Sequence, residues 1–293
     1  MSSAFLSSIP LTTTLLSSSE FINEFSEVFL ISLRVKLRKL LYKIPANTLF
    51  VGKVVEYMPS CHSTNDSARE LLLQHDTSEG TVVITDNQTA GKGQRGNSWF
   101  SAEGANLTMS LIMKPNFLTV SKQFYLNMIS SLAVRRVLND RLPDANSQVK
   151  WPNDVLLNNR KVCGILIENG IKRQFLEHSV VGIGLNVNQK AFGLATATSM
   201  SNEMGIAFSL QSVFEKLLGQ FEALYLKLKA ERYSEIKDEY LQNLIGFNQW
   251  RKYRSEYVFD GQIVDVLDSG QLKLATQQGD KLFDFKEIEF IWN

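Results

Sequence analysis

Histidine and cysteine are scarce in this chain, and their positions limit the chemistry that it can carry. Among 293 residues there are three histidines and two cysteines, Cys61 and Cys163. Two cysteines do not provide a disulfide framework, and unpaired thiols are typical of a reducing compartment, which predicts a cytoplasmic protein. No histidine lies at ligand spacing beside a cysteine, so we expect no zinc site.

An excess of charge of either sign is also missing, as is any long apolar run. Lys and Arg number 31 and Asp and Glu number 30, which gives a net charge of +1. Proteins that bind nucleic acid through its phosphates usually carry a basic excess, so we expect no nucleic-acid partner. Polar residues interrupt every candidate for the roughly 20 apolar residues of a membrane-spanning helix, so we expect no membrane segment either.

Residues 1–46 differ from the rest of the chain. The first 19 residues carry no charge, and basic residues are concentrated between 34 and 43. A secretory signal places its positive charges before the apolar run, which is the reverse of the order found here. A helix on a membrane surface over 25–43 is one interpretation. We favour the other, a poorly ordered N-terminal extension of the kind that a misread start codon would produce.

Hydrophobic patterning over 47–245 predicts alternating strands and helices. A capping pattern at Ser63–Asp66 precedes the first predicted helix. We expect strands at 49–57, 81–85, 106–114, 148–151, 154–157, 161–169 and 179–188, and helices at 68–73, 121–139, 210–230 and 235–244. This mixture predicts an α+β fold with a mixed, mostly antiparallel sheet.

The pattern changes after residue 246. Short candidate strands are interrupted by Gly261, Gly270 and Gly279, at even spacing. Such spacing of glycine turns between alternating strands predicts a small β-barrel over 246–293.

A basic glycine-rich loop at 91–99 is the first feature with chemical content. Gly91, Gly93 and Gly96 allow backbone N–H groups to approach an anion, and Lys92 and Arg95 supply positive charge. The loop is not a P-loop, because no Lys-Ser/Thr pair follows it, and it does not open the helix that a dinucleotide fingerprint requires. It predicts phosphate or carboxylate binding, with a flexible surface turn as the alternative.

Two further segments have a possible role in ligand binding. Lys150 ends a predicted strand and precedes a rigid Trp-Pro turn, which is suited to holding one cation in place for a carboxylate or phosphate. An exposed lysine at a plain turn is the alternative. The strand 182–188 carries glycines and ends in asparagines, so either a ligand or another backbone approaches it closely or its glycines serve packing.

Five motifs in order carry a family resemblance. They are STN (63–65), QTAGKGQRGNSW (88–99), KWPND (150–154), KVCGILIE (161–168) and GIGLNVN (182–188). Over about 50–290 the chain resembles biotin protein ligases, also called holocarboxylase synthetases. The resemblance implies a class II synthetase-like biotin/lipoate ligase catalytic domain at 47–245 and an SH3-like domain at 246–293. Because 1–46 lack a winged helix-turn-helix pattern, it implies the type that is not a repressor.

The resemblance also implies a reaction and its participants. Members of this family join biotin to ATP, form biotinyl-5′-AMP with release of pyrophosphate, and pass biotin to a specific lysine of a biotin carboxyl carrier domain. The enzyme is then a ligase forming a carbon–nitrogen bond, a biotin–(acetyl-CoA-carboxylase) ligase. Mg²⁺ is expected because ATP needs a cation bridging its phosphates. The chain leaves open which carboxylase is served and whether the protein is a monomer or a homodimer.

Carried over residue by residue, the resemblance implies a set of site residues. Lys150 bridges the biotin carboxylate and the α-phosphate, and Arg95 is the second catalytic residue. Biotin contacts are expected from Ser63, Thr64, Asn65, Gln88, Lys92, Gly93, Gln94, Lys150 and Gly164. Nucleotide contacts are expected from Gly91, Lys92, Arg95, Gly96, Trp99, Asn153 and Asn186, with no metal ligands from the protein.

This chain departs from the family's common glycine loop. Lys92, Gln94 and Asn97 stand where the family pattern has arginine. Lysine lacks the planar fork of arginine, and glutamine has no charge, so we expect a weaker hold on the adenylate. That predicts promiscuous labelling of lysines by the purified protein with biotin and ATP.

Three alternatives to a ligase differ from it in their motifs. A lipoate ligase or octanoyltransferase shares the fold, but its Arg-Arg-x-x-Gly-Gly-Gly loop is absent here. A biotin-binding or nucleotide-sensing module without transfer activity stays open. A carrier domain is excluded, because its Met-Lys-Met tip is missing. Cys61 and Cys163 are expected to be small packing residues, since no base is placed beside them.

Overall fold

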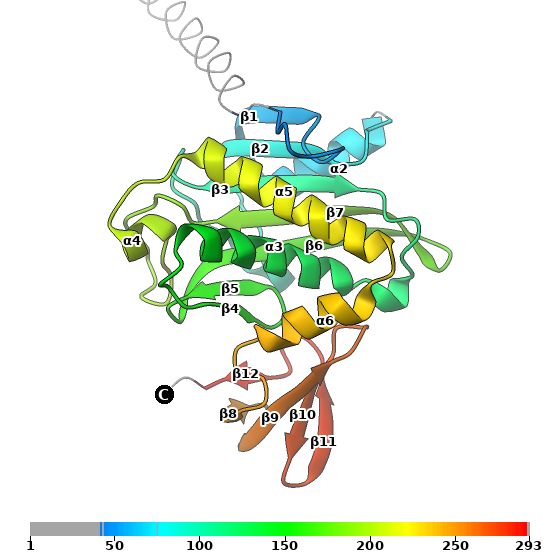
Figure 1. Ribbon diagram of the computed structural model, residues 1–293, viewed down its shortest axis with the longest axis vertical. Coiled ribbons are helices and arrows are strands. Elements are labelled where there is room, and N and C mark those ends of the chain that lie inside the picture. Colours follow the sequence, from blue (N-terminus) through cyan, green and yellow to red (C-terminus); the bar gives the residue numbers. More distant parts are fainter. Residues whose placement is uncertain (1–41, 43, 75, 292–293) are drawn as a thin grey trace, which may run out of the picture. The chain divides into compact units, whose positions relative to one another are not determined.

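Two β-sheets, with helices on both faces of the larger one, make up the described part of the chain (Figure 1). The computed structural model describes residues 42, 44–74 and 76–291, and only the backbone of Arg95. Most of the extension predicted at 1–46 therefore lies outside the described residues. Residues from Tyr42 onward belong to one compact unit.

The larger sheet has seven strands in the order β1-β2-β3-β7-β6-β5-β4. Only β1 and β2 are parallel, and every other neighbouring pair is antiparallel. The strands are β1 (Val55–Cys61), β2 (Thr81–Gln88), β3 (Leu107–Met113), β4 (Ser147–Lys150), β5 (Asp154–Leu157), β6 (Arg160–Lys172) and β7 (Phe175–Leu185). This confirms the predicted α+β fold with a mixed, mostly antiparallel sheet.

The two faces of this sheet are covered differently. Val82 and Ile84 of β2 point into the main core, whereas Val83 between them points to the opposite face, as the period of two requires. The main core lies under α3 (Tyr125–Arg141) and α5 (Leu210–Lys229), with α6 (Tyr233–Gln242) beside them. Among the helices that the structure describes, α2 (Thr64–Gln74) is the one that packs on the opposite face, and it covers only part of it.

The first strand begins later than predicted. We expected a strand over 49–57, but β1 starts at Val55. The backbone N–H groups of Leu49, Phe50 and Val51 instead donate to the carboxylate of Glu222 in α5, at 2.6, 2.8 and 2.8 Å. A carboxylate 171–173 positions away competes with strand pairing for these donors, and local patterning does not reveal it.

Removing this carboxylate should destabilise the protein. Glu222 is buried, so in Glu222→Ala the three N–H groups lose a charged acceptor, and the more buried ones are left unpaired. We expect the free energy of unfolding to fall by about 2–4 kcal/mol. Urea unfolding measures this, with the exposed Glu70→Ala of α2 as a control expected to lie within about 0.5 kcal/mol of the unsubstituted protein. A Glu222→Ala variant as stable as the control would contradict the assignment.

The second sheet comes from the C-terminal part of the chain and has the order β11-β10-β9-β8-β12. Its strands are β8 (Trp250–Arg254), β9 (Val258–Val266), β10 (Leu272–Thr276), β11 (Gly279–Phe283) and β12 (Glu289–Phe290), and all its pairings are antiparallel. The predicted small β module is therefore confirmed, whereas its boundary near residue 246 stays a prediction. Gly261 was expected at a turn and instead lies within β9, where a side chain would contact Tyr253 and Leu274.

Other predicted elements agree with the structure within a few residues. The helix expected from 121 begins as α3 at Tyr125, and α4 (Met200–Met204) was not predicted at all. A five-residue helix offers too little periodicity to be recognised. Within the described residues, no helix has both the length and the apolar character needed to cross a bilayer.

Candidate active site

A single row of cross-strand partners forms the floor of the candidate site. Lys150 of β4 pairs with Asp154 of β5, Asp154 pairs with Gly164 of β6, Gly164 pairs with Gly184 of β7, and Gly184 pairs with Thr108 of β3. Directly opposed residues point to the same face of a sheet. The row therefore runs from two charged side chains to two glycines on the open face, next to α2.

This row of residues lines a cavity of about 500 Å³. Its walls come from the start of α2, the end of β2, the glycine-rich loop, the turn between β4 and β5, and the C-terminal segment that includes β12. Gly164, Gly182 and Gly184 lie in the floor. A cavity of this size suits a small organic ligand.

The start of α2 supplies a network of polar groups at one end of the cavity. Ser110 Oγ donates to Asn65 Oδ1 (2.6 Å) and lies 2.7 Å from the hydroxyl oxygen of Thr64, and Asn65 Nδ2 donates to Glu168 (2.7 Å). Gln88 Oε1 accepts from the backbone N–H and the hydroxyl of Thr64. Each bond fixes the orientation of a donor or acceptor, so this end is suited to a neutral ligand with polar edges.

Gly182 is needed for this arrangement. A Cβ atom at Gly182 would lie 2.3 Å from Asn65 Oδ1, too close for both groups to stay in place. The glycine thus allows the first turn of α2 to approach the sheet. At Gly182 the packing alternative for segment 182–188 is the one found, because the approaching group is a side chain of the protein's own helix. Close approach of a ligand to this strand stays a prediction.

Trp99 lies on the two glycines at the centre of the row. A Cβ at Gly184 would lie 2.4 Å from the Trp99 ring, and a Cβ at Gly164 would lie 2.9 Å from it. The indole Nε1 is buried and has no hydrogen-bond partner among the residues that the structure describes. An unsatisfied buried donor at the edge of a cavity is a candidate contact for a ligand.

Lys161 is a cavity residue to which we assigned no role from the sequence. Its Nζ lies 2.7 Å from Asp154 Oδ1 and 5.4 Å from the centre of the Trp99 ring, and its Cε would contact a Cβ at Gly164. Three neighbours therefore hold this cation at the middle of the row. The register of β5 and β6 shifts between Val155 and Leu156, and this bulge is not visible in sequence patterning.

Lys150 also lines the cavity, near its C-terminal wall, and its predicted contact with the biotin carboxylate and the α-phosphate stays a prediction. Its Nζ lies 5.8 Å from the centre of the Phe290 ring. The adjoining Trp151 is buried, donates from Nε1 to the Gly270 carbonyl (2.9 Å), and packs edge-on against Phe285. These contacts join the turn after Lys150 to the second sheet, so that sheet supplies a wall of the cavity.

The glycine-rich loop closes on itself beside the cavity. Trp99 N donates to Gly91 O (2.9 Å), and Gly93 N donates to Asn97 O (2.6 Å). A Cβ at Gly91 would lie 2.3 Å from Trp99 O, and Gly96 has a positive φ of 83°, so both positions require glycine. Lys92 Nζ is bound to the carboxylate of Asp66, at 2.7 Å from Oδ2.

The predicted site residues thus fall into two groups. Those that line the cavity are Ser63, Thr64, Asn65, Gln88, Lys92, Gly93, Gln94, Trp99, Lys150, Asn153 and Gly164. Gly91, Gly96 and Asn186 are not part of its lining, and the side chain of Arg95 lies outside the described residues. Asp154, which belongs to the KWPND motif, also lines the cavity. The residues that sequence reasoning missed are Lys161, Ser110, and the C-terminal Lys286, Ile288, Glu289 and Phe290; the C-terminal residues carry no local signal.

The two asparagines expected at the nucleotide have structural contacts. Asn153 Nδ2 donates to the Ile165 carbonyl (2.5 Å) and so ties the turn after Lys150 to β6. Asn186 is buried, and its Nδ2 donates to the Thr198 carbonyl (3.0 Å). Asn153 therefore holds the turn while it lines the cavity, and the nucleotide contact of Asn186 stays a prediction.

The two cysteines take no part in the cavity lining. Burial raises the pKa of the Cys163 thiol far above its ordinary value, and burial also raises that of Cys61. A thiol with a raised pKa is a poor nucleophile at neutral pH. Both observations agree with the predicted packing role.

Comparison with known proteins gives consistent matches. A sequence profile of the biotin/lipoate A/B protein ligase family matches residues 57–186. The bifunctional ligase/repressor BirA of Bacillus spizizenii is 31% identical over 248 residues, covering 83% of this chain and 75% of BirA. The biotin–(acetyl-CoA-carboxylase) ligase of Paracoccus denitrificans is 28% identical over 240 residues, covering 78% of this chain and 97% of that protein. The biotin protein ligase from Aquifex aeolicus, solved in complex with biotin and ATP, superposes with a TM-score of 0.68 at 25% identity, covering 82% of this chain and 100% of that one.

Proposed function

This chain belongs to the biotin protein ligases of the biotin/lipoate A/B protein ligase family, and we propose that it activates biotin with ATP and transfers it to a carrier protein. The acceptor is a lysine of a biotin carboxyl carrier domain, and the names of several relatives favour that of acetyl-CoA carboxylase. The observation that carries the proposal is the cavity, which has fixed neutral polar groups at one end and two lysines along its floor. We place the reaction in the cytoplasm.

The polar end of the cavity is the proposed site of the ureido ring of biotin. A ureido group presents two N–H donors and one carbonyl acceptor, and all three need partners when they are buried. Ser63, Thr64, Asn65 and Gln88 offer hydroxyl and amide groups of both kinds. The network through Ser110 keeps Thr64 and Asn65 oriented before the ligand binds, and Thr64 in turn orients Gln88, which lowers the entropy cost of binding.

The lysines are the proposed site of the first chemical step. An oxygen of the biotin carboxylate attacks the α-phosphorus of ATP, the bond to the bridging oxygen breaks, and pyrophosphate leaves. Two anions must approach each other in this step, and a fixed cation between them offsets their repulsion. Lys161 at the centre of the row and Lys150 beside it supply that charge.

The second step transfers the acyl group. The ε-amine of the acceptor lysine attacks the acyl carbon of biotinyl-5′-AMP, AMP leaves, and the attacking nitrogen loses a proton. A new amide bond replaces the mixed anhydride, so no redox partner is needed.

Mg²⁺ is proposed to enter with ATP as part of the substrate. Among the described residues there is no group of three or more His, Cys, Asp or Glu side chains that could hold a metal ion. Of the cavity carboxylates, Asp154 is paired with Lys161 and Glu289 with Arg254. The ion would therefore keep phosphate oxygens and water as its main ligands, which Mg²⁺ tolerates well.

Exchange of labelled pyrophosphate into ATP tests the proposed activation step. We expect exchange that depends on biotin and does not occur with lipoate or octanoate in its place. Exchange with lipoate or octanoate would favour the lipoate branch of the family. Saturable binding of biotin without any exchange would favour a sensing module.

A further inference from the structure

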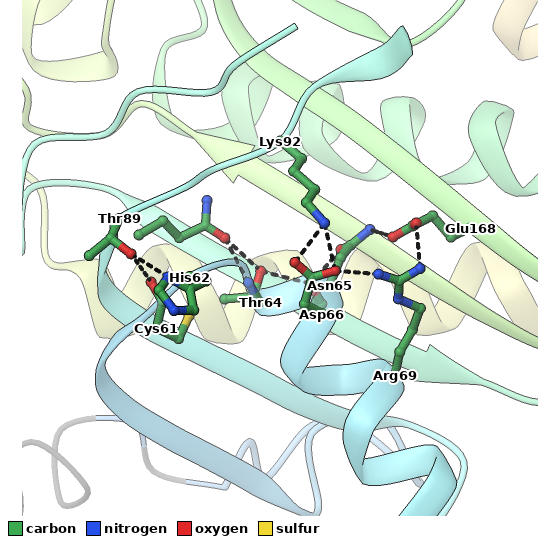
Figure 2. A network of polar contacts seen from close by, with 11 residues as sticks. Cys61, His62, Thr64, Asn65, Asp66, Arg69, Thr89, Lys92 and Glu168 are labelled. Carbon is green, nitrogen blue, oxygen red and sulfur yellow. Dashed lines mark hydrogen bonds and ion pairs between the residues drawn. The ribbon is translucent and has the colours of Figure 1, made fainter. Parts of the chain in front are cut away.

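An ion pair joins the glycine-rich loop to α2 at the edge of the cavity. Lys92 Nζ lies 2.8 Å from Asp66 Oδ1 and 2.7 Å from Oδ2 (Figure 2). Asp66 is in the first turn of α2 and directly follows Asn65, which lines the cavity. The contact therefore connects the loop to the helix that forms the polar end of the site.

Asp66 also has a partner within its own helix. Arg69, one turn further along α2, also donates to Asp66 and lies 3.3 Å from Glu168 (Figure 2). Glu168 in turn accepts from Asn65. Burial alone would raise the pKa of the Asp66 carboxyl, but hydrogen bonds from Lys92 and Arg69 outweigh it and lower that pKa, so the carboxylate is charged at neutral pH.

Few other contacts hold the central part of the loop. The backbone bonds between Gly93 and Asn97 and between Gly91 and Trp99 connect the loop only to itself. Among the side chains of 92–98 that the structure describes, Lys92 makes the one hydrogen bond or ion pair with another element. Rupture of this pair would therefore leave the loop held mainly at its two ends.

We propose that Asp66 is a positioning residue, which fastens the 91–99 loop beside the cavity through Lys92 and thereby slows the escape of biotinyl-5′-AMP. This inference rests on the proposed function. It gives Lys92 a role in holding the loop, in addition to the biotin and nucleotide contacts that the resemblance implies for it. Gln94 and Asn97 are neutral in this chain, so retention of the adenylate depends more on the ion pair between Lys92 and Asp66.

The test measures escape of the adenylate separately from its formation. The adenylate is formed on the protein from biotin and ATP, excess substrates are removed, and the release rate is followed with a trap for free adenylate. We expect Asp66→Asn to release it about threefold to fivefold faster, the range expected for loss of a partly exposed ion pair. Asp66 does not line the cavity, so the rate of pyrophosphate exchange should change little.

Two further variants distinguish loss of the Lys92–Asp66 ion pair from a general disturbance of α2. Arg69→Gln removes the other cation from Asp66 and leaves the loop contact intact, so its release rate should stay near that of the unsubstituted protein. In a Lys92→Gln background, Asp66→Asn should cause no additional increase, because the partner is already absent. An increase that persists in that background would show an effect through α2 and would overturn the proposal.

Amide hydrogen exchange of the ligand-free protein adds a readout that does not depend on catalysis. Asp66→Asn should accelerate exchange over 92–98, and Arg69→Gln should not. If Asp66→Asn changes neither amide hydrogen exchange nor the release rate of the adenylate, the proposed role of Asp66 is wrong. Biotin-dependent pyrophosphate exchange would still support the proposed function in that case. A protein that forms no adenylate would contradict the proposed function, and the retention role of Asp66 with it.

Discussion

Replacing Lys161 by alanine should lower the rate of biotin-dependent adenylate formation by about a hundredfold to a thousandfold, the loss seen when one preorganised charge-stabilising group is removed. Lys161 forms an ion pair with Asp154, its amine lies over the ring of Trp99, and its side chain packs beside Gly164. A cation fixed in this way needs no reorganisation when charge develops at the α-phosphate. Single-turnover formation of the adenylate measures the effect.

Lys150→Ala and Lys216→Ala complete this experiment. The family resemblance predicts that Lys150→Ala also loses adenylate formation, but Lys150 lies toward Phe290 rather than at the centre of the row. We therefore expect the larger loss in Lys161→Ala. Lys216 of α5 pairs with Asp140 away from the cavity, so its variant should keep full activity. Full activity of Lys161→Ala would contradict the proposed placement of the first step.

A side chain at Gly184 should have the second large effect on activity. The Cβ of Gly184→Ala would lie 2.4 Å from the Trp99 ring, so the indole and the end of the glycine-rich loop must move. We expect the kcat/KM for biotin to fall about tenfold to a hundredfold, because small displacements of positioned groups carry losses of this order. Steady-state transfer kinetics measure this.

Two variants make the Gly184 result specific. Gly193→Ala places a Cβ where nothing lies within 4 Å, so it should behave like the unsubstituted protein. In a Trp99→Ala background the space above Gly184 is free, and Gly184→Ala should then add little further loss. A Gly184→Ala variant that is fully active, or equally damaging without the indole, would contradict the proposed role of this glycine surface.

Much of the fold could be predicted because it depends on local patterning. The short apolar run in 81–85 and the leucine and aromatic stripe of 210–230 correspond closely to β2 and α5. The strand expected at 49–57 begins only at Val55, because the backbone N–H groups of residues 49–51 donate to Glu222, which is far away in the chain. The turn predicted at Gly261 was wrong, because a glycine within a strand and a glycine at a turn look the same in the sequence.

The candidate site could be predicted where motif and geometry coincide. Lys150 and Asp154 flank one tight turn, so their opposition across β4 and β5 follows from spacing alone. Lys161 reaches Asp154 through a shift of register, and the wall at Phe290 depends on where the second sheet packs. Neither is encoded in local sequence. The ion pair between Asp66 and Lys92 likewise joins residues from separate elements, so local sequence does not reveal it.

The central claim is that this chain attaches biotin to one lysine of a carrier domain through an adenylate. The most direct test incubates the purified chain with biotin, MgATP and a biotin carboxyl carrier domain, and then measures the intact mass of that domain. We predict the mass of one added biotin, located at the acceptor lysine and absent when that lysine is replaced by arginine. A carrier domain that gains no biotin, or gains lipoate or octanoate instead when these are supplied, would contradict the account.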